Sequence, residues 1–300
     1  MEEEQNKKIP EYQYANAKDK LLYFGVFPQE LKEDSVTVAE TSEAFGYFLG
    51  SDGNYYAKLK ATPYADLYTF KNGLEIEKDK EYWFKVSPIK WQVLNVQDGI
   101  ALLVSEDVIA AGSFLGGCRT PVRDVTFPEK DCLICGQYNM YDESTMRSWL
   151  NREFLSAAFP PEQQEWILTT RVDNGVASTC EWSNRHACPD TDDKVFLLST
   201  AEAREDYLWD NKAFECSNIA AKCPTDYARA MGASSFSAEG FSPRISGRAN
   251  SEGYAWWWLR SPDPFYEDSV KACDGSRFGI HDGLDRCGGV VPALRVKLPL

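Results

Sequence analysis

Two apolar blocks decide the fold of this chain: Gly-Tyr-Ala-Trp-Trp-Trp-Leu-Arg-Ser-Pro at residues 253–262 and Gly-Gly-Val-Val-Pro-Ala-Leu-Arg-Val-Lys-Leu at residues 288–298. In the second block, apolar and charged residues alternate from Leu294 to Leu298. Alternation with a period of two is typical of a half-buried strand. We therefore expect core strands over residues 254–259 and 290–298.

The tryptophan triplet is better explained by packing than by carbohydrate stacking. Successive residues of a strand point to opposite faces, so Trp256 and Trp258 share one side and Trp257 takes the other. At least one of the two sides must lie in the core. We expect the guanidinium of Arg260, which follows, to anchor the next segment by hydrogen bonds to carbonyls or a carboxylate, with stacking on an indole as the alternative.

The segment between the two blocks is the candidate contact surface. Residues 263–288 are rich in Asp, Gly, Ser and Arg, which predicts a loop. The same segment carries Phe265, Tyr266, Phe278 and His281, ring-bearing side chains that a solvated loop seldom contains. Two interpretations stay open: the rings bind a ligand, or they tuck into the fold beneath a long crossover.

Composition limits the class of partner. The chain has 300 residues, 43% of them hydrophobic, which suits a globular domain with a sizeable core. Its 32 Lys and Arg against 46 Asp and Glu give a net charge of −14. That charge repels phosphate backbones and anionic lipid surfaces, so we expect neither nucleic acid nor a membrane as a partner.

The N-terminal region predicts strands after a charged leader. Residues 1–18 have few apolar anchors and no signal-peptide core, and apolar residues nowhere run for a membrane span, so we expect a cytoplasmic location. We expect one domain over residues 19–300, with a separate β subdomain over residues 19–75 as the alternative. Strands are predicted over residues 21–27, ended by Pro28, and as short segments within residues 44–68.

A hairpin and several short helices follow. Strands are predicted over residues 81–86, 89–94 and 100–104, with Asp98-Gly99 as the hairpin turn. Ser144 is expected to cap a helix that buries Met146, Trp149, Leu150 and Phe154, and a second helix is expected from Pro161 to about Ile167. A buried strand over residues 194–199 leads into a Ser199–Glu202 capping box and a helix to about Leu208, and Thr225-Asp226 caps a helix that Gly232 ends.

Cysteines offer a possible zinc site. The count of nine is odd, and a chain of this size does not need disulfides, so we expect mostly reduced thiols. A second Cys-x-x-Cys pair is missing, so scattered structural cysteines remain the alternative to zinc. The residues that would supply zinc ligands are Cys118, Cys132, Cys135, Cys180, His186 and Cys188.

Catalytic groups are scarce. The chain has two histidines and lacks a Gly-x-Ser-x-Gly elbow, a phosphate-binding Walker loop and a His-Glu-x-x-His motif. We therefore expect a binding protein rather than an enzyme, with no cofactor and with an unidentified protein or small molecule as the ligand.

Several stretches together resemble a bacterial domain family of unknown function. That family is marked by a Trp-Trp-Leu-Arg-Ser-Pro block, here residues 257–262, and a Val-x-Pro-Ala-Leu block, here residues 290–294. Further matching stretches are Tyr23-Phe24-Gly25, Lys90-Trp91, Arg147-x-Trp149-Leu150-Asn151, residues 193–199 and Asp226-Tyr227-Ala228. The resemblance spans most of the chain and assigns no reaction.

The C-terminal tail also resembles C-type-lectin-like folds, including the variable proteins of diversity-generating retroelements and relatives of the formylglycine-generating enzyme. This resemblance implies an α+β, C-type-lectin-like fold, mostly antiparallel sheet with a few short helices, that displays residues 263–287 as a variable ligand surface. The expected ligand-binding residues are Asp263, Phe265, Tyr266, Arg277, Phe278, His281, Asp282, Leu284, Asp285 and Arg286. The formylglycine relatives imply an alternative, a cysteine and copper oxidoreductase that uses Cys273 and Cys287.

Overall fold

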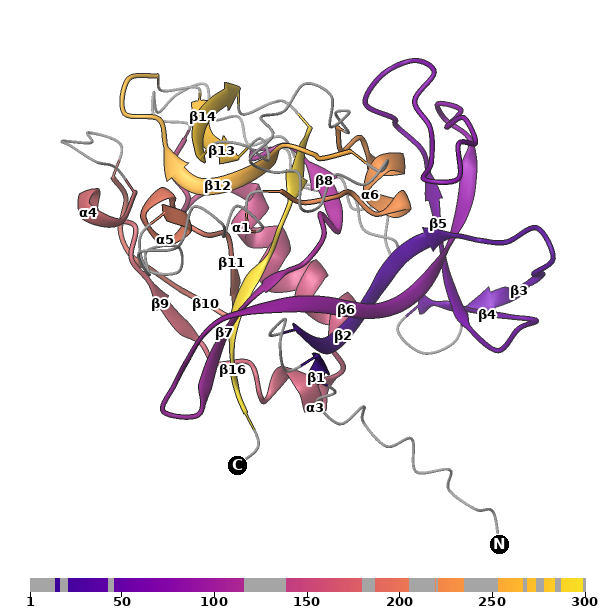
Figure 1. Cartoon of the computed structure of the whole chain (residues 1–300), viewed down its shortest axis with the longest axis horizontal. Helices are drawn as coiled ribbons and strands as arrows, with labels where there is room; N and C mark the ends of the chain where they lie inside the picture. Colours follow the sequence, from indigo (N-terminus) through magenta and orange to yellow (C-terminus); the bar gives the residue numbers. More distant parts are fainter. Residues whose placement is uncertain are drawn as a thin grey trace, which may run out of the picture.

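The structure is a computed structural model of the chain. It describes residues 14–16, 21–42, 46–115, 139–179, 187–204, 219, 221–234, 253–266, 269–273, 278–283 and 287–298. Within these ranges the fold is mostly antiparallel sheet with a few short helices, as the sequence predicts (Figure 1). No helix among these residues is long and apolar enough to cross a membrane.

The larger sheet has nine strands among the described residues. Seven of them follow the order β11-β16-β7-β6-β5-β4-β3, and β2 pairs with both β6 and β1. Their bounds are β1 Tyr14–Asn16, β2 Leu21–Leu31, β3 Val38–Ser42, β4 Phe48–Gly50, β5 Tyr55–Lys60, β6 Glu81–Gln97, β7 Ile100–Ser105, β11 Val195–Phe196 and β16 Ala293–Lys297. β1 lies inside the expected leader, and its pairing with β2 attaches that part of the leader to the sheet.

Two strands are longer than the sequence predicts. The prediction ended or interrupted each strand at a proline, whereas the observed strands continue through it. β2 continues past Pro28 to Leu31, and β6 is one strand rather than two, running through Pro88. The β2–β6 register is irregular just after Pro28 and again just before Val26, which pairs with Pro88. Proline lacks a backbone N–H, so strands accept it at such irregular positions.

Gly25 lies in the irregular stretch of β2 between Tyr23 and Val26. Its φ is 68°, and a Cβ there would lie 2.4 Å from the Phe159 ring. The backbone carbonyl of the preceding Phe24 accepts a hydrogen bond of 2.7 Å from the indole of Trp91. The two long strands therefore bend around a tightly packed aromatic contact.

The predicted helix after Ser144 forms, but it is divided. Ser144 caps it by accepting from the Arg147 N–H, and α1 Thr145–Trp149 passes through a π-helical turn, η3 Leu150–Phe154, into α2 Leu155–Ala158. The four predicted apolar residues are fully buried. The next helix, α3 Pro161–Gln164, ends earlier than predicted because Ile167 forms a bridge with Val296.

Two predicted helix caps are confirmed. Ser199 and Glu202 form the reciprocal capping box of α5 Thr200–Arg204, at distances of 3.0 Å and 2.8 Å. The expected end near Leu208 lies outside the described residues. Thr225 caps α6 Asp226–Met231, and Gly232 ends α6 with a φ of 110°.

The buried strand predicted over residues 194–199 is shorter than expected. Only β11 pairs, because the carbonyls of Leu197 and Leu198 accept hydrogen bonds from Arg260 instead. Nearby, β9 Thr170–Val172 and β10 Thr191–Asp193 form a two-stranded sheet, and α4 Val176–Thr179 follows β9.

Two strands of a second sheet lie within the predicted loop over residues 263–288. Its order is β14-β13-β12-β15-β8, and β12 and β15 are parallel. Its strands are β8 Ala110–Gly112, β12 Trp257–Pro262, β13 Ser269–Cys273, β14 Phe278–Gly283 and β15 Gly288–Val290. The expected strand over residues 290–298 is also divided, since β15 belongs to this sheet and β16 to the larger one.

One main apolar cluster joins the two sheets. It runs from Leu22 to Val296 and includes residues of β2, β6, β7, β12 and β16 as well as the helices. The described strands β3, β4 and β5 continue the larger sheet through β6.

The Gly25 contact predicts a stability difference between two glycines. Gly25→Ala should lower the free energy of unfolding by about 3 kcal/mol, because the methyl group meets Phe159 and the backbone is left-handed. Gly53→Ala should lower it by only about 1 kcal/mol, since Gly53 has a φ of 79° but open space around it. Urea denaturation measures both, and equal losses would contradict the packing argument.

Candidate binding site

The strand that carries the candidate site is buried along its whole length. β12 is covered on both faces, with Trp257 and Trp258 fully buried and Trp256 just before them nearly so. The rings of Trp256 and Trp258 meet edge to face at 4.8 Å, which confirms that they share one side. A Cβ on Gly288 would lie 2.3 Å from the Trp256 ring, so this packing requires glycine in β15.

Arg260 fastens β12 to the segments beside it. Its side chain is fully buried and donates to the carbonyls of Leu197 and Asp173, at 2.8 Å and 3.0 Å. It also donates to the carboxylate of Glu202, the residue that completes the α5 capping box. The predicted anchoring by carbonyls and a carboxylate is therefore confirmed.

The chain leaves β12 through a turn that Asp263 organises. Asp263 is 1% exposed, and its Oδ1 accepts from the backbone N–H of Phe265 at 2.8 Å and of Tyr266 at 3.1 Å. Its Oδ2 pairs with the Lys271 ammonium at 2.7 Å. Burial, the largest influence, raises the pKa of Asp263, but these hydrogen bonds and the Lys271 charge outweigh it and hold the pKa below its usual range.

Asn139 holds the same turn from inside the molecule. Its Nδ2 lies within hydrogen-bond distance of three carbonyl oxygens, at 3.3 Å from Asp263, 3.0 Å from Tyr266 and 3.0 Å from Ser269. Backbone bonds from Asp263 N–H to the Ser269 carbonyl and from Ser269 N–H to the Tyr266 carbonyl close the turn. One buried amide thus adds a side-chain donor to three carbonyls of the turn, two of which also accept these backbone bonds.

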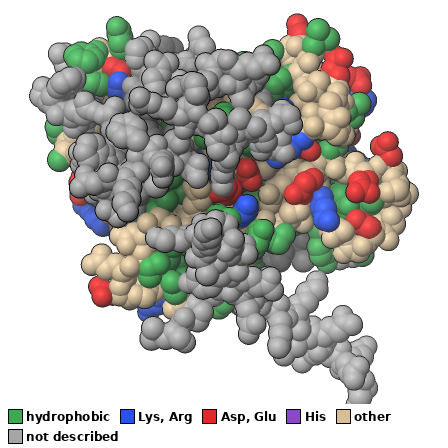
Figure 2. Space-filling model, in the orientation of Figure 1, with side chains coloured by type: hydrophobic (Ala, Val, Ile, Leu, Met, Phe, Trp, Pro, Cys, Tyr) green, Lys and Arg blue, Asp and Glu red, His purple; other side chains and the backbone are tan. Residues whose placement is uncertain are grey.

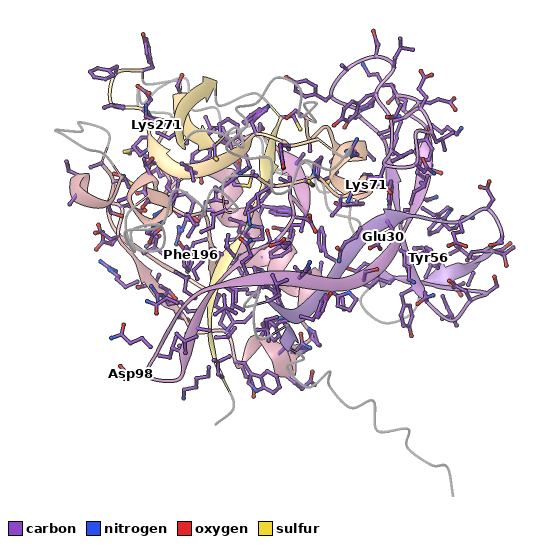
Figure 3. All side chains as sticks on the ribbon, in the orientation of Figure 1. Glu30, Tyr56, Lys71, Asp98, Phe196 and Lys271 are labelled. Atoms are coloured by element: carbon purple, nitrogen blue, oxygen red, sulfur yellow. The ribbon has the colours of Figure 1, made fainter. Side chains whose placement is uncertain are left out.

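Two aromatic side chains project from this fixed turn into solvent. Phe265 is 72% exposed and Tyr266 is 53% exposed. The β12–β13 connection projects at the upper left of Figure 1, where Figure 2 shows hydrophobic side chains at the surface. Lys271, labelled in Figure 3, lies at the base of this projection. We call residues 263–266 the aromatic tip.

The other predicted ligand-binding residues are only partly placed. Phe278, His281 and Asp282 lie in β14, where their backbones pair with Cys273, Lys271 and Val270 of β13. The hairpin thus joins them to the strand that follows the aromatic tip. The remaining four, Arg277, Leu284, Asp285 and Arg286, lie outside the described residues.

The described residues give little support to a zinc site or a copper site built from cysteines. Cys188 is a buried free thiol whose pKa burial raises to about 11, and the other five expected zinc ligands lie outside the described residues. Cys273 is buried in β13 and Cys287 is half-buried against the Met231 carbonyl, and neither is in a disulfide. No group of three metal-ligating side chains occurs among the described residues.

Sequence reasoning missed the residues that hold the tip. Asn139 precedes it by more than a hundred residues, and no motif in one sequence links them. Lys271 could have been found, because a lysine within an otherwise apolar strand needs a counter-charge and Asp263 lies at the strand entry.

Removing the Asn139 amide should loosen the tip. We expect Asn139→Ala to lower the free energy of unfolding by about 2 kcal/mol and to speed amide hydrogen exchange at Ser269, because three carbonyls of the turn lose the buried amide as a donor. Asn95→Ala, at an exposed position of β6, is the matched control and should change neither measurement. Unchanged exchange at Ser269 in Asn139→Ala would refute this role.

The Asp263–Lys271 pair predicts a pH dependence. Because the folded-state pKa of Asp263 is depressed, its contribution is present at neutral pH and is lost as the pH falls through that pKa. Asp263→Asn should therefore lower the free energy of unfolding by about 2 kcal/mol near pH 7, and by progressively less toward about pH 3. Denaturation across this range measures the difference, with Asp98→Asn at the exposed hairpin turn as the control. A penalty that does not shrink in acid would contradict the ion pair.

Comparison with known proteins gives a family for this chain. A family model described as "Domain of unknown function (DUF6273)" matches residues 122–298, more than half of the chain. The match includes β12, the aromatic tip and the hairpin that follows it. Searches of curated proteins and of solved structures find no match. The chain belongs to the family of the DUF6273 domain.

Proposed function

We propose that this protein is a non-catalytic binding domain that recognises a protein or small-molecule ligand through residues 263–287, with Phe265 and Tyr266 as the anchors. The observation that carries the proposal is the exposure of two adjacent aromatic rings on a turn fixed by buried Asp263 and Asn139. Exposed rings on a disordered loop would have no such support.

The energetics favour this arrangement for binding. Aromatic side chains bury a large area on contact and lose little rotamer freedom, which is why they dominate interface hot spots. A backbone that is already ordered adds little further entropy cost on binding. The tip meets both conditions, since Asp263 and Asn139 fix the backbone while the two rings remain in solvent.

The finer proposal is a C-type-lectin-like scaffold whose 263–287 segment is diversified by a retroelement. It is supported by the placement of the tip and the β13–β14 hairpin between two buried strands, β12 and β15. Sequencing the gene in many cells of one host population tests it. Substitutions confined to these codons and to adenine positions of a template repeat are expected, and an invariant segment would overturn it.

Photo-crosslinking from the tip should capture the ligand if it is a protein. Phe265 replaced by p-benzoyl-phenylalanine should give discrete crosslinked partners in extract of the native host, and the same replacement at exposed Val96 should not. The purified partner is then titrated by calorimetry. We expect the Phe265→Ala/Tyr266→Ala variant to bind about 1,000-fold more weakly than wild type, because each hot-spot aromatic contributes about 2 kcal/mol or more.

Two controls make the result decisive. Val96→Ala removes exposed apolar surface from β6 and should leave the affinity unchanged. Circular dichroism should show that the double variant is folded, since neither ring is in the core. Equal affinity of the double variant and wild type would exclude the aromatic tip as the binding surface.

A further inference from the structure

A second apolar surface lies at the opposite end of the molecule from the aromatic tip. The segment 62–76, which connects β5 to β6, exposes Tyr64, Leu67 and Leu74, with 78% of Leu67 accessible to solvent. In Figure 1 this segment projects at the upper right, and Figure 2 shows hydrophobic and acidic side chains together there. We call it the β5–β6 loop.

The β5–β6 loop is held rigidly against α6. The Tyr68 hydroxyl donates to the Ala233 carbonyl at 2.8 Å, and the Arg229 guanidinium lies over the Tyr68 ring at 5.8 Å and donates to the Thr69 carbonyl. Asp226 of α6 accepts from the Lys71 N–H at 2.8 Å. The exposed leucines therefore stand on an ordered scaffold, as the two rings of the aromatic tip do.

The backbone at Leu67 is strained. Its φ is 59°, in the left-handed region that disfavours side chains other than those of Gly, Asn and Asp. The other two non-glycine residues with positive φ among the described residues are Asp79 and Asp98, which tolerate this conformation. A leucine that is both strained and exposed does not serve the stability of the fold, so a different role has to explain it.

The charge beside these apolar side chains is negative. Asp66 lies between Tyr64 and Leu67, Glu75 follows Leu74, and both carboxylates are exposed. Lys71 of the same loop is also exposed, and its positive charge acts on Asp107: burial raises the pKa of Asp107, and Lys71 is the nearby charge that opposes the rise most. Figure 3 labels Lys71 beside α6.

We infer that the β5–β6 loop is a docking surface for a partner protein that presents an amphipathic segment with apolar side chains flanked by lysine or arginine. Leu67, Leu74 and Tyr64 supply the apolar contact, and Asp66 and Glu75 face the cationic side chains. The net charge of −14 disfavours a second copy of this chain at an acidic surface and repels anionic lipid.

A pair of labelled peptides tests the inference on the full chain. The probe is a fluorescein-labelled amphipathic helical peptide of leucine and lysine, and its counterpart carries glutamate in place of lysine. Fluorescence anisotropy should show that the lysine peptide binds wild type at least about tenfold more tightly than the glutamate peptide. Leu67→Asn/Leu74→Ala should weaken binding of the lysine peptide about tenfold or more.

Charge and stability variants separate this role from a structural one. Asp66→Asn/Glu75→Gln should weaken the binding of the lysine peptide and reduce the salt dependence of that binding. Leu67→Asn alone should keep or raise the midpoint of thermal unfolding, because asparagine tolerates the left-handed backbone. Val96→Ala should bind the lysine peptide as wild type does, since Val96 is exposed but lies outside the β5–β6 loop.

Four results would overturn the inference. The first is that both peptides bind equally well, and the second is that Leu67→Asn/Leu74→Ala binds the lysine peptide as tightly as wild type. The third is that Leu67→Asn lowers the midpoint of thermal unfolding. The fourth is that light scattering shows a concentration-dependent dimer that Leu67→Asn abolishes. The last result would assign the surface to a second copy of the chain instead.

Discussion

The buried guanidinium of Arg260 is the interaction on which the candidate site depends. It joins β12 to three other segments, through the carbonyls of Leu197 and Asp173 and the carboxylate of Glu202. A fully buried charge is tolerated only when its hydrogen bonds and its counter-charge are in place. Losing one partner would therefore leave the buried guanidinium uncompensated and destabilise the fold. The position of β12, and of the turn that follows it, is therefore specified by electrostatics as well as by the packing of Trp257 and its neighbours.

The aromatic tip is likewise held in place by buried polar side chains. Asp263 and Asn139 are buried polar side chains that direct their hydrogen bonds at the backbone of the turn, while the side chains of Phe265 and Tyr266 are exposed to solvent. Exposed side chains outside the core can be replaced at little cost to the scaffold. A surface built in this way suits recognition, because its specificity can change while the fold persists.

The β5–β6 loop also exposes apolar side chains from an ordered backbone, but a helix holds that backbone. There α6 supplies the fixed partners, through Asp226 and Arg229, and the loop exposes two leucines and a tyrosine. The two surfaces project from opposite ends of the molecule in the view of Figure 1. Separate surfaces of this kind allow one domain to contact two partners at once without competition.

Local patterns in the sequence determined the capped helices, the Asp98-Gly99 hairpin and the burial of the tryptophan block, because caps, turns and strand alternation depend on residues a few positions apart. Tertiary structure alone decided that β2 and β6 run through prolines, that β13 pairs with β14, and that Asn139 holds the aromatic tip. Each of these depends on a partner strand or side chain distant in sequence. A single sequence carries no signal for such pairings, since their free energy arises only when the two segments meet.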